Sequence, residues 1–406
     1  YYTEGFWGYR QYDVLNAHYI LLWGADPLAA NRQVSYYSKV WGDAVDKATI
    51  SIVEPRLSAS AGKADEWLPI KPGQDGALAV SIAHILLVEG LWYKPFVGDF
   101  VDGENHFIPG QTVDETTFEE KYTNGIVKWW NLELKDKTAE WAAERTGLSA
   151  EQIRRVAIGY GKAAPHAISW LGGGPCMQVR GGYTSMAVHA LNGIVGAVDN
   201  IGGTLKTNKE YTKKFPKEKP FLDDIAKKGK KHEKIDQRGR LHIPCIKSGK
   251  PGSGVITNNA ADGIINEDPN EIKVAIAYMN NFAFSAPQPE RWERALSKIP
   301  FLVHITTNAS EFSWFADIAL PDTHHMIEKW GYVKNHANGY RHVTLMQPII
   351  KNNFDYKIDE TEIPWLIAEK LSERGFDNML RHFKEYKDPE TGKAPTNEKE
   401  FALYSL

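Results

Sequence analysis

The chain has 406 residues, of which 42% are hydrophobic and 12% aromatic, and its formal net charge is −3, with 48 Lys and Arg against 51 Asp and Glu. This length predicts two or three folded cores rather than one small module. The composition excludes a disordered chain, and the near-neutral charge argues against a dedicated nucleic-acid binder. No stretch reaches the roughly 18 consecutive apolar residues of a membrane helix, so we expect no direct membrane span.

Cysteine is rare, with Cys176 and Cys245 as the two examples. Two thiols are too few for an iron–sulfur or zinc cluster, which takes about four closely spaced ligands. We therefore expect no metal cluster from this chain itself. The sequence begins with Tyr1 and no initiator Met or signal segment precedes it, so we expect a piece of a longer protein.

Strand and helix signals alternate through the first half of the chain. The predicted strands are residues 19–23, 49–53, 67–70 and 167–171, and the predicted helices are residues 29–45, 75–90, 149–163 and 183–198. Residues 95–145, rich in Trp, are expected to form a partly helical excursion. The alternation favours a parallel sheet with helices on both faces.

The segment 206–250 differs from the rest of the chain, because it holds 15 Lys and Arg against 6 Asp and Glu and few large apolar side chains. We interpret it as a polar surface connector, and a basic lining for an anionic ligand is the alternative.

The second half repeats the strand and helix pattern. Strands are predicted at 273–278 and 301–305, with a helix at 291–297 between them and an amphipathic helix at 363–374 that ends before Gly375. The predicted fold is α/β with two Rossmann-like parallel-sheet domains. Their expected extents are 1–203 and 266–375, with a Lys-rich connector at 204–265 and a linker at 376–406.

Polar turns follow several of the predicted strands, where open α/β sheets bind their ligands. These turns are Gly24-Ala-Asp-Pro27, Glu54-Pro-Arg56, Lys71-Pro-Gly-Gln-Asp75 and Gly172-Gly-Gly-Pro-Cys-Met-Gln178. Glycines let backbone amides approach a phosphate, Arg neutralises it, and a carboxylate hydrogen-bonds a ribose or a guanine edge. The sequence contains neither a GxGxxG fingerprint nor a P-loop, which disfavours ordinary NAD or ATP binding.

The order and spacing of these segments resemble the molybdopterin oxidoreductases of the dimethyl sulfoxide reductase family. The matching segments are Trp23–Pro27, Val53–Arg56, Trp67–Asp75, Asn280-Asn281, Phe315–Pro321 and Glu328–Gly331, so the resemblance covers almost the whole chain. It implies the fold of domains 1–3 of formate dehydrogenase and dimethyl sulfoxide reductase. It further implies a 4Fe-4S cluster and a molybdenum ligand upstream, and another domain downstream.

The resemblance also implies a molybdenum bis(molybdopterin guanine dinucleotide) cofactor. For one dinucleotide, the implied binding residues are Gly24, Asp26, Pro27, Glu54, Pro55, Arg56, Gly73, Asp75, Gly172, Gly173 and Gln178. For the other they are Asn280, Asn281, Thr306 and Thr307. The chain departs from the family in having Asp26 where Asn is frequent and Glu54 where Asp is frequent.

Within the family, segments such as 97–100, 128–136, 177–180, 189–192 and 359–365 are most similar to the catalytic subunits of respiratory arsenate reductases. This implies reduction of arsenate by oxygen-atom transfer, a small iron–sulfur electron-transfer subunit as partner, and a periplasmic location or the outer face of the cytoplasmic membrane. Reductases of tetrathionate or thiosulfate, arsenite oxidase and a non-catalytic scaffold with this fold are the alternatives. We expect the 406 residues alone to be inactive.

Candidate catalytic residues are few in this chain. Arg180 and Lys329 are candidates for binding an oxyanion, although surface ion pairs explain such residues equally well. His324 is a candidate for proton delivery, with packing beside a pterin as the alternative. Cys176 is expected to be structural, and His84 and His189 to be core histidines with satisfied hydrogen bonds.

Overall fold

The computed structural model describes residues 3, 10–206, 216–238, 240, 257–323, 331–337, 340–356, 358, 360 and 362–404. The chain divides into two compact units. The first comprises Tyr1–Asn208 and His336–Arg341, and the second comprises Lys209–Asn335 and His342–Leu406. Each unit contains a parallel sheet, which confirms the predicted α/β class. The domain boundaries expected after residues 203, 265 and 375 stay predictions.

The first unit is built on four parallel strands in the order β4-β3-β2-β7. These strands are β2 (Tyr19–Trp23), β3 (Thr49–Val53), β4 (Glu66–Leu68) and β7 (Ala167–Leu171). In the register of the sheet, Trp23 lies beside Val53 on one side and Leu171 on the other. The carboxyl ends of the strands therefore lie at one edge.

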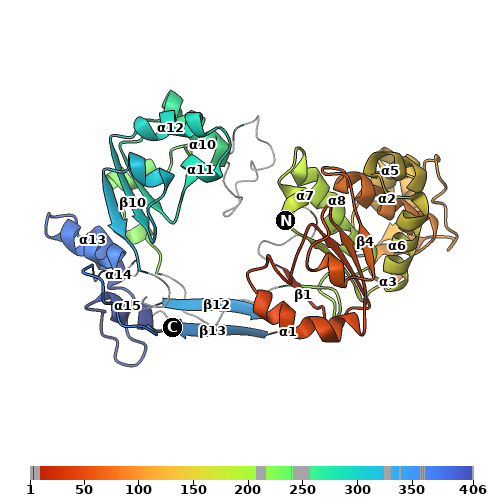
Figure 1. Ribbon diagram of the computed structural model, residues 1–406, viewed down its shortest axis with the longest axis horizontal. Helices are drawn as coiled ribbons and strands as arrows, with labels where there is room; N and C mark the ends of the chain where they lie inside the picture. Colours follow the sequence, from red (N-terminus) through yellow and green to blue (C-terminus); the bar gives the residue numbers. More distant parts are fainter. Residues whose placement is uncertain are drawn as a thin grey trace. The chain divides into compact units, whose positions relative to one another are not determined.

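Alternate residues of the strands enter two separate cores, since successive side chains point to opposite faces. Ile20 and Leu22 pack with the buried side of α1 (Val34–Val45), whereas Leu21 and Trp23 face the larger core. The larger core contains α2 (Asp75–Val88), α6 (Ala150–Lys162) and α8 (Gly181–Ile194). Helices thus cover both faces of the sheet (Figure 1).

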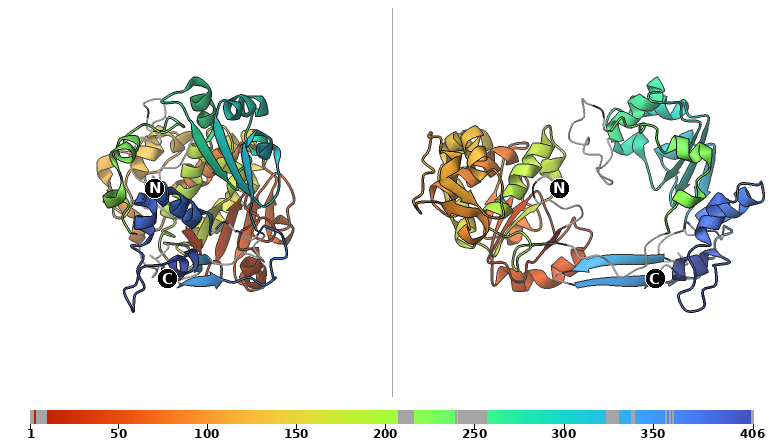
Figure 2. Two further views of the ribbon diagram at one scale, coloured as in Figure 1. Left: turned by 90° about the vertical axis from the view of Figure 1, so that its left-hand side faces the viewer. Right: turned by 180° about the vertical axis from the view of Figure 1, so that it is seen from behind.

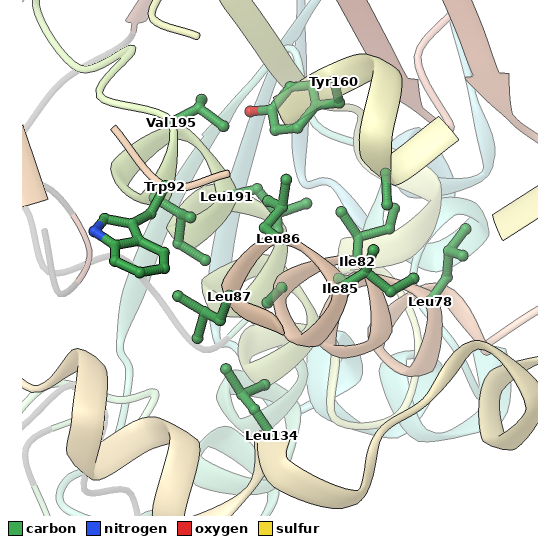
Figure 3. Packing of buried hydrophobic residues seen from close by; sticks show 14 of the residues in the cluster. Leu78, Ile82, Ile85, Leu86, Leu87, Trp92, Leu134, Tyr160, Leu191 and Val195 are labelled. Carbon is green, nitrogen blue, oxygen red and sulfur yellow. The ribbon is translucent and has the colours of Figure 1, made fainter. Parts of the chain in front are cut away.

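The predicted helix at 75–90 is confirmed as α2, which is largely buried because α6, α8 and α5 (Ala139–Thr146) pack around it. Its side chains meet Leu134 on one side and Leu191 on another (Figure 3).

The smaller elements of this unit include the partly helical excursion predicted for residues 95–145. They are β1 (Arg10–Tyr12), α3 (Lys94–Val97), β5 (Gly98–Phe100), β6 (Phe118–Glu120), α4 (Ile126–Leu132), α5 (Ala139–Thr146), α7 (Gly173–Cys176) and β8 (Thr204–Lys206), with 3-10 turns at Ala61–Lys63, Glu115–Thr117 and Leu134–Asp136.

Two helix boundaries differ from the prediction by four or more residues. The helix expected from residue 29 begins at Val34, because the amides of Ala29 and Ala30 close a turn on the Asp26 carbonyl. The helix expected at 183–198 is α8, which ends at Ile194. Gly196 follows with a φ of +67°, a left-handed conformation typical of helix ends.

Ser149 is the N-cap of α6, since its hydroxyl accepts a hydrogen bond of 3.1 Å from the Gln152 amide. Replacing Ser149 with Ala is expected to destabilise the first unit by about 1 kcal/mol, which lowers its melting temperature by roughly 2–4 °C. Ser149→Asp, which retains an acceptor, is the control and is expected to melt like the parent. Thermal unfolding followed by circular dichroism measures both, and an unchanged melting temperature for Ser149→Ala contradicts the prediction.

The second unit contains three parallel strands in the order β11-β10-β9. They are β9 (Val274–Tyr278), β10 (Phe301–Thr306) and β11 (Ile318–Pro321). The helices α10 (Thr257–Asn266), α11 (Phe282–Ser285) and α12 (Pro289–Ser297), together with a 3-10 turn at Glu311–Phe315, lie on one side of these strands (Figure 2). Leu302 and Leu296 belong to the core between them.

The remaining elements follow or precede this sheet in the chain. The strands β12 (Gly331–Ala337) and β13 (Tyr340–Met346) pair with each other. The helices are α9 (Asp224–Gly229), α13 (Ile363–Ser372), α14 (Asn378–Phe383) and α15 (Glu398–Tyr404), with a 3-10 turn at Lys219–Phe221. Among the helices of the described ranges, none combines the length and the apolar character that a membrane crossing requires.

Candidate functional site

Four polar turns lie at the carboxyl edge of the first sheet, as the sequence predicts. The strand register places Leu68 beside Val53, Val53 beside Trp23, and Trp23 beside Leu171. The turns that follow these residues hold all eleven positions that the family resemblance implies for one dinucleotide.

The glycine turns after β2 and β7 touch each other through their backbones. The Gly172 amide donates a hydrogen bond of 2.7 Å to the Trp23 carbonyl. A Cβ atom on Gly172 would lie 2.1 Å from the Gly24 carbonyl oxygen, and one on Gly24, whose φ is +55°, would lie 2.6 Å from Pro175 Cδ. Only glycine fits at these two positions, so the edge presents bare backbone there.

Three charged side chains gather at the turns after β2 and β3. Arg56 Nη2 lies 3.9 Å from Asp26 Oδ2, and Arg56 Nε lies 3.8 Å from Glu54 Oε1. The Arg56 side chain is 73% exposed, whereas that of Asp26 is 8% exposed. Burial raises the pKa of Glu54, Arg56 lowers it, and the nearby Asp26 raises it further. The exposed Arg56 guanidinium therefore lies near two carboxylates, those of Asp26 and Glu54, that are mostly buried.

Asp26 is held by a residue that the sequence analysis does not single out. The Ser60 hydroxyl donates a hydrogen bond of 2.6 Å to Asp26 Oδ1, and the Ser60 amide donates one of 3.2 Å to the same atom. Ser60 is completely buried. No sequence signal could reveal it, because the two residues are 34 positions apart and belong to different turns. Pro27 is buried beside Asp26, and Pro55 is exposed beside Arg56.

Asp75 is the first residue of α2 and is 6% exposed. Burial raises the pKa of its carboxyl group, and a hydrogen bond from its own backbone amide lowers it. Within the described part of the chain, no other group donates a hydrogen bond to this carboxylate. Gly73 has a φ of +84°, and a Cβ atom on it would lie 3.5 Å from Gln178 Oε1. The Asp75 turn thus adjoins the segment that contains Gly173 and Gln178.

Arg180 precedes α8 in a left-handed conformation, with a φ of +62°. Its side chain makes no ion pair with any described residue. It lines a cavity of about 1410 Å³ together with Gly73, Gln74 and Thr184, among other residues of the first unit. A guanidinium without an ion-pair partner among the described residues, beside the Gly73 turn, can bind an anion.

The second sheet brings the other predicted residues to its own carboxyl edge. Asn281 Nδ2 donates a hydrogen bond of 2.7 Å to Glu311 Oε2, and its Oδ1 accepts one of 3.1 Å from the Phe312 amide. Asn280 Oδ1 accepts a hydrogen bond of 3.0 Å from the Phe282 amide. Both amide side chains therefore shape the turn after β9.

The turn after β10 holds the two predicted threonines. The Thr306 hydroxyl donates a hydrogen bond of 2.8 Å to the Asn308 carbonyl, and Thr307 is exposed. The sequence analysis did not select Asp322 and Thr323, which follow β11 at the same edge and are 9% and 5% exposed. The Thr323 hydroxyl is buried and has no hydrogen-bond partner among the described residues. Their position directly after the segment Phe315–Pro321, which resembles the family, could have revealed them.

The two other candidate catalytic residues, His324 and Lys329, lie outside the described residues. Cys176 is exposed; its thiol lies 3.2 Å from the Gly172 carbonyl oxygen and accepts a hydrogen bond from Ser185. His84 is a satisfied core residue, with Nδ1 2.7 Å from the Leu134 carbonyl oxygen. For His189 the expectation of satisfied hydrogen bonds is wrong, because its Nδ1 is buried without a partner in the described chain. Burial lowers the pKa of His189 to about 3.

The family comparison matches residues 7–374 to the family described as "Molybdopterin oxidoreductase". The chain belongs to this family. Members bind a molybdenum–pterin cofactor, so family membership implies such a cofactor here.

Two curated relatives in this family are similar over nearly the whole chain. Both are named "Arsenate respiratory reductase molybdopterin-containing subunit ArrA". The one from Shewanella sp. (strain ANA-3) is 54% identical over 99% of this chain and 47% of its own length. The one from Chrysiogenes arsenatis is 51% identical over 99% of this chain and 48% of its own length. The chain spans about half the length of these relatives.

More distant proteins are also similar to this chain. A putative dimethyl sulfoxide reductase chain of Escherichia coli is 25% identical over 90% of this chain and 44% of its own length. The solved structure of acetylene hydratase from Pelobacter acetylenicus matches with a TM-score of 0.68 and 18% identity, covering 97% of this chain and 52% of that one. The latter match supports the fold alone.

The residues at the first edge fit a dinucleotide cofactor. The glycine turns present bare backbone at this edge, and the buried Asp75 carboxylate has acceptor capacity that no other described residue uses. A guanine base offers adjacent N–H donors of the kind that a carboxylate accepts. The described residues include no group of three or more His, Cys, Asp or Glu placed to hold a metal ion.

Proposed function

We propose that this chain is the central part of the catalytic subunit of a respiratory arsenate reductase, an enzyme that reduces arsenate to arsenite in anaerobic respiration. The observation that carries the proposal is the identity of 54% and 51% to two subunits of that name over 99% of the chain. In this reaction arsenate gains two electrons and loses one oxygen, which leaves with two protons as water.

The cofactor in this proposal is molybdenum bis(molybdopterin guanine dinucleotide). One guanosine end would be held by the first edge, with Asp75 accepting from the guanine, Glu54 and Asp26 from the ribose, and Arg56 and the glycine amides facing the phosphates. Asn280, Asn281, Thr306 and Thr307 would contribute to the other half. The 4Fe-4S cluster that supplies electrons would be bound by another part of the protein.

The chain's own residues bind and orient, and the bound molybdenum–pterin group supplies the oxygen-atom transfer and the two-electron redox change. Arsenate carries one or two negative charges, so its approach requires a cation that is not neutralised by a carboxylate. Arg180 is such a cation in the described chain, and it lines the cavity beside the cofactor turns. We assign it the role of attracting and orienting the oxyanion.

The partner in this proposal is a small iron–sulfur electron-transfer subunit, and the location is the periplasm or the outer face of the cytoplasmic membrane. The alternative of a non-catalytic scaffold is disfavoured by Asp75, because a buried carboxylate to which no other described residue donates a hydrogen bond destabilises a chain that binds no cofactor.

A reduced-viologen assay of the full-length enzyme tests the function. Arsenate is expected to be reduced faster than tetrathionate or thiosulfate, and faster turnover of either sulfur oxyanion overturns the substrate assignment. Arg180→Ala is expected to lower kcat/KM for arsenate by about tenfold to a hundredfold, since a charge-assisted hydrogen bond contributes about 1.5–3 kcal/mol. Arg154→Ala, which removes an exposed arginine paired with Glu140, is the control and is expected to leave kcat/KM unchanged. Equal effects of the two variants contradict the role of Arg180.

A further inference from the structure

Asn192 is a buried amide in the apolar second half of α8, and its exposed fraction is 0%. Its Nδ2 donates a hydrogen bond of 2.9 Å to the Ser169 carbonyl, and its Oδ1 accepts one of 2.8 Å from the Ser169 amide. The Tyr160 hydroxyl lies 3.5 Å from the same Oδ1. The Asn192 side chain thus makes hydrogen bonds with both the amide and the carbonyl of Ser169, which a neighbouring strand would otherwise do.

This arrangement completes the edge of β7. In the described sheet β7 pairs with β2 alone, so the backbone groups of Ser169 that bond Asn192 point away from the sheet. A buried backbone group without a partner costs about 1–3 kcal/mol. Because Asn192 of α8 supplies these hydrogen bonds to Ser169, α8 is held at one position along β7.

A second set of hydrogen bonds extends this connection to the neighbouring strand. The Ser169 hydroxyl accepts a hydrogen bond of 3.0 Å from Trp23 Nε1 and donates one of 3.0 Å to the Val188 carbonyl in α8. All four residues, Asn192, Ser169, Trp23 and Val188, are completely buried. The network joins α8, β7 and β2 without contact to solvent.

Two residues of this network, one on β2 and one on β7, lie just before the two glycine turns in the chain. Trp23 immediately precedes Gly24, and its carbonyl accepts the hydrogen bond from Gly172, which lies three residues after Ser169. At the other end of α8, Thr184 approaches the Asp75 turn so closely that a Cβ atom on Gly76 would lie 3.0 Å from its hydroxyl. The position of α8 along β7 therefore determines how these turns meet.

We propose that Asn192 is a positioning residue for the first cofactor site, which holds α8 at one register on the sheet and thereby keeps the Gly172–Gln178 and Gly24–Pro27 turns in contact. The inference rests on the proposed assignment of these turns to the cofactor. Asn192 itself touches neither cofactor nor substrate in this role.

Two substitutions of similar size distinguish a positioning role of Asn192 from a general contribution to the stability of the fold. Asn192→Leu removes both hydrogen bonds. Asn192→Asp retains the shape, and its protonated carboxyl group can donate to the Ser169 carbonyl and accept from the Ser169 amide, whereas the ionised form places negative charge against that carbonyl. Of the groups bonded to Asn192, only Tyr160 is titratable, and burial raises its pKa well above its usual value, so it stays neutral.

The measurement is the rate at which cofactor-loaded, full-length protein loses pterin and molybdenum, followed by pterin fluorescence and elemental analysis. Asn192→Leu is expected to lose the cofactor about tenfold faster than the parent. Asn192→Asp is expected to lose it rapidly at about pH 8 and to approach the parent at about pH 5.5, because burial favours the protonated form. Thr146→Val, which removes a buried hydroxyl bonded to the Ala142 carbonyl, is the control and is expected to retain the cofactor.

Two outcomes overturn the inference. One is cofactor retention by Asn192→Leu equal to that of Thr146→Val at matched melting temperature. The other is an Asn192→Asp variant whose retention changes with pH no more than that of the parent, and this outcome decides the matter if Asn192→Leu does not fold. A parent protein that contains neither molybdenum nor pterin instead refutes the proposed function.

Discussion

Replacing Asp75 with Asn is expected to weaken retention of the molybdenum–pterin cofactor by about tenfold to a hundredfold. The carboxylate can accept hydrogen bonds from two adjacent donors of a guanine, whereas an amide presents one acceptor and one donor. A lost charge-assisted hydrogen bond costs about 1.5–3 kcal/mol, and the mismatched amide adds to that. Pterin fluorescence and molybdenum content of the purified full-length protein measure the effect.

The same substitution is expected to leave the cofactor-free protein equally or more stable at neutral pH. Burial raises the pKa of Asp75, so the folded protein holds the ionised carboxylate at a cost that asparagine avoids. This advantage is expected to shrink as the pH falls through the raised pKa of folded Asp75. It vanishes below the ordinary pKa of aspartate, where Asp75 is protonated in both the folded and the unfolded state. Thermal unfolding of the cofactor-free variant and parent across this pH range measures it.

Asp46→Asn, at the exposed end of α1, is the control for the Asp75 variant and is expected to change neither stability nor cofactor content. Normal cofactor content in Asp75→Asn, or a loss of stability at neutral pH large enough to explain a low content, contradicts the assignment of Asp75 to the guanine.

Replacing Gly172 with Ala is expected to destabilise the first unit by about 1–3 kcal/mol and to lower cofactor content as well. The added Cβ atom would lie 2.1 Å from the Gly24 carbonyl oxygen, and neither backbone can move without separating the two turns. The φ of Gly172 is −93°, which alanine adopts readily, so the effect arises from the contact and not from backbone strain.

Gly174→Ala provides a matched control two residues further along the same turn. A Cβ atom there would lie 4.0 Å from the nearest atom, Gly24 Cα, so this variant is expected to stay within about 0.5 kcal/mol of the parent. Chemical denaturation gives both values. If Gly172→Ala and Gly174→Ala have the same free energy of unfolding, the turns after β2 and β7 are not in tight contact at Gly172.

The sequence was sufficient to predict the strands of the first sheet, two of the three strands of the second sheet, and the edge at which the polar turns meet. Runs such as Tyr19–Trp23 are apolar and end in polar turns, and parallel pairing then brings those turns to one edge regardless of tertiary detail. Family resemblance added the individual residues of the cofactor site, and their cofactor roles stay predictions.

Hydrogen bonds between residues far apart in the chain could not be predicted from the local sequence pattern. Ser60 holds Asp26 across 34 positions and Asn192 bonds Ser169 across 23, and neither residue stands out in its own segment. The left-handed conformation of Arg180, which separates α7 from α8, was missed because non-glycine residues adopt it rarely.

The two sheets lie in separate parts of the chain, so the ribosome synthesises them at different times. The strands of the first sheet all lie before residue 172, whereas the first strand of the second sheet begins at Val274. Domains generally fold in the order of translation, which proceeds at roughly 5–20 residues per second. The first edge is therefore complete several seconds before the second sheet leaves the ribosome. The two sheet edges therefore form one after the other, and a chain that stops between them still presents the complete first edge.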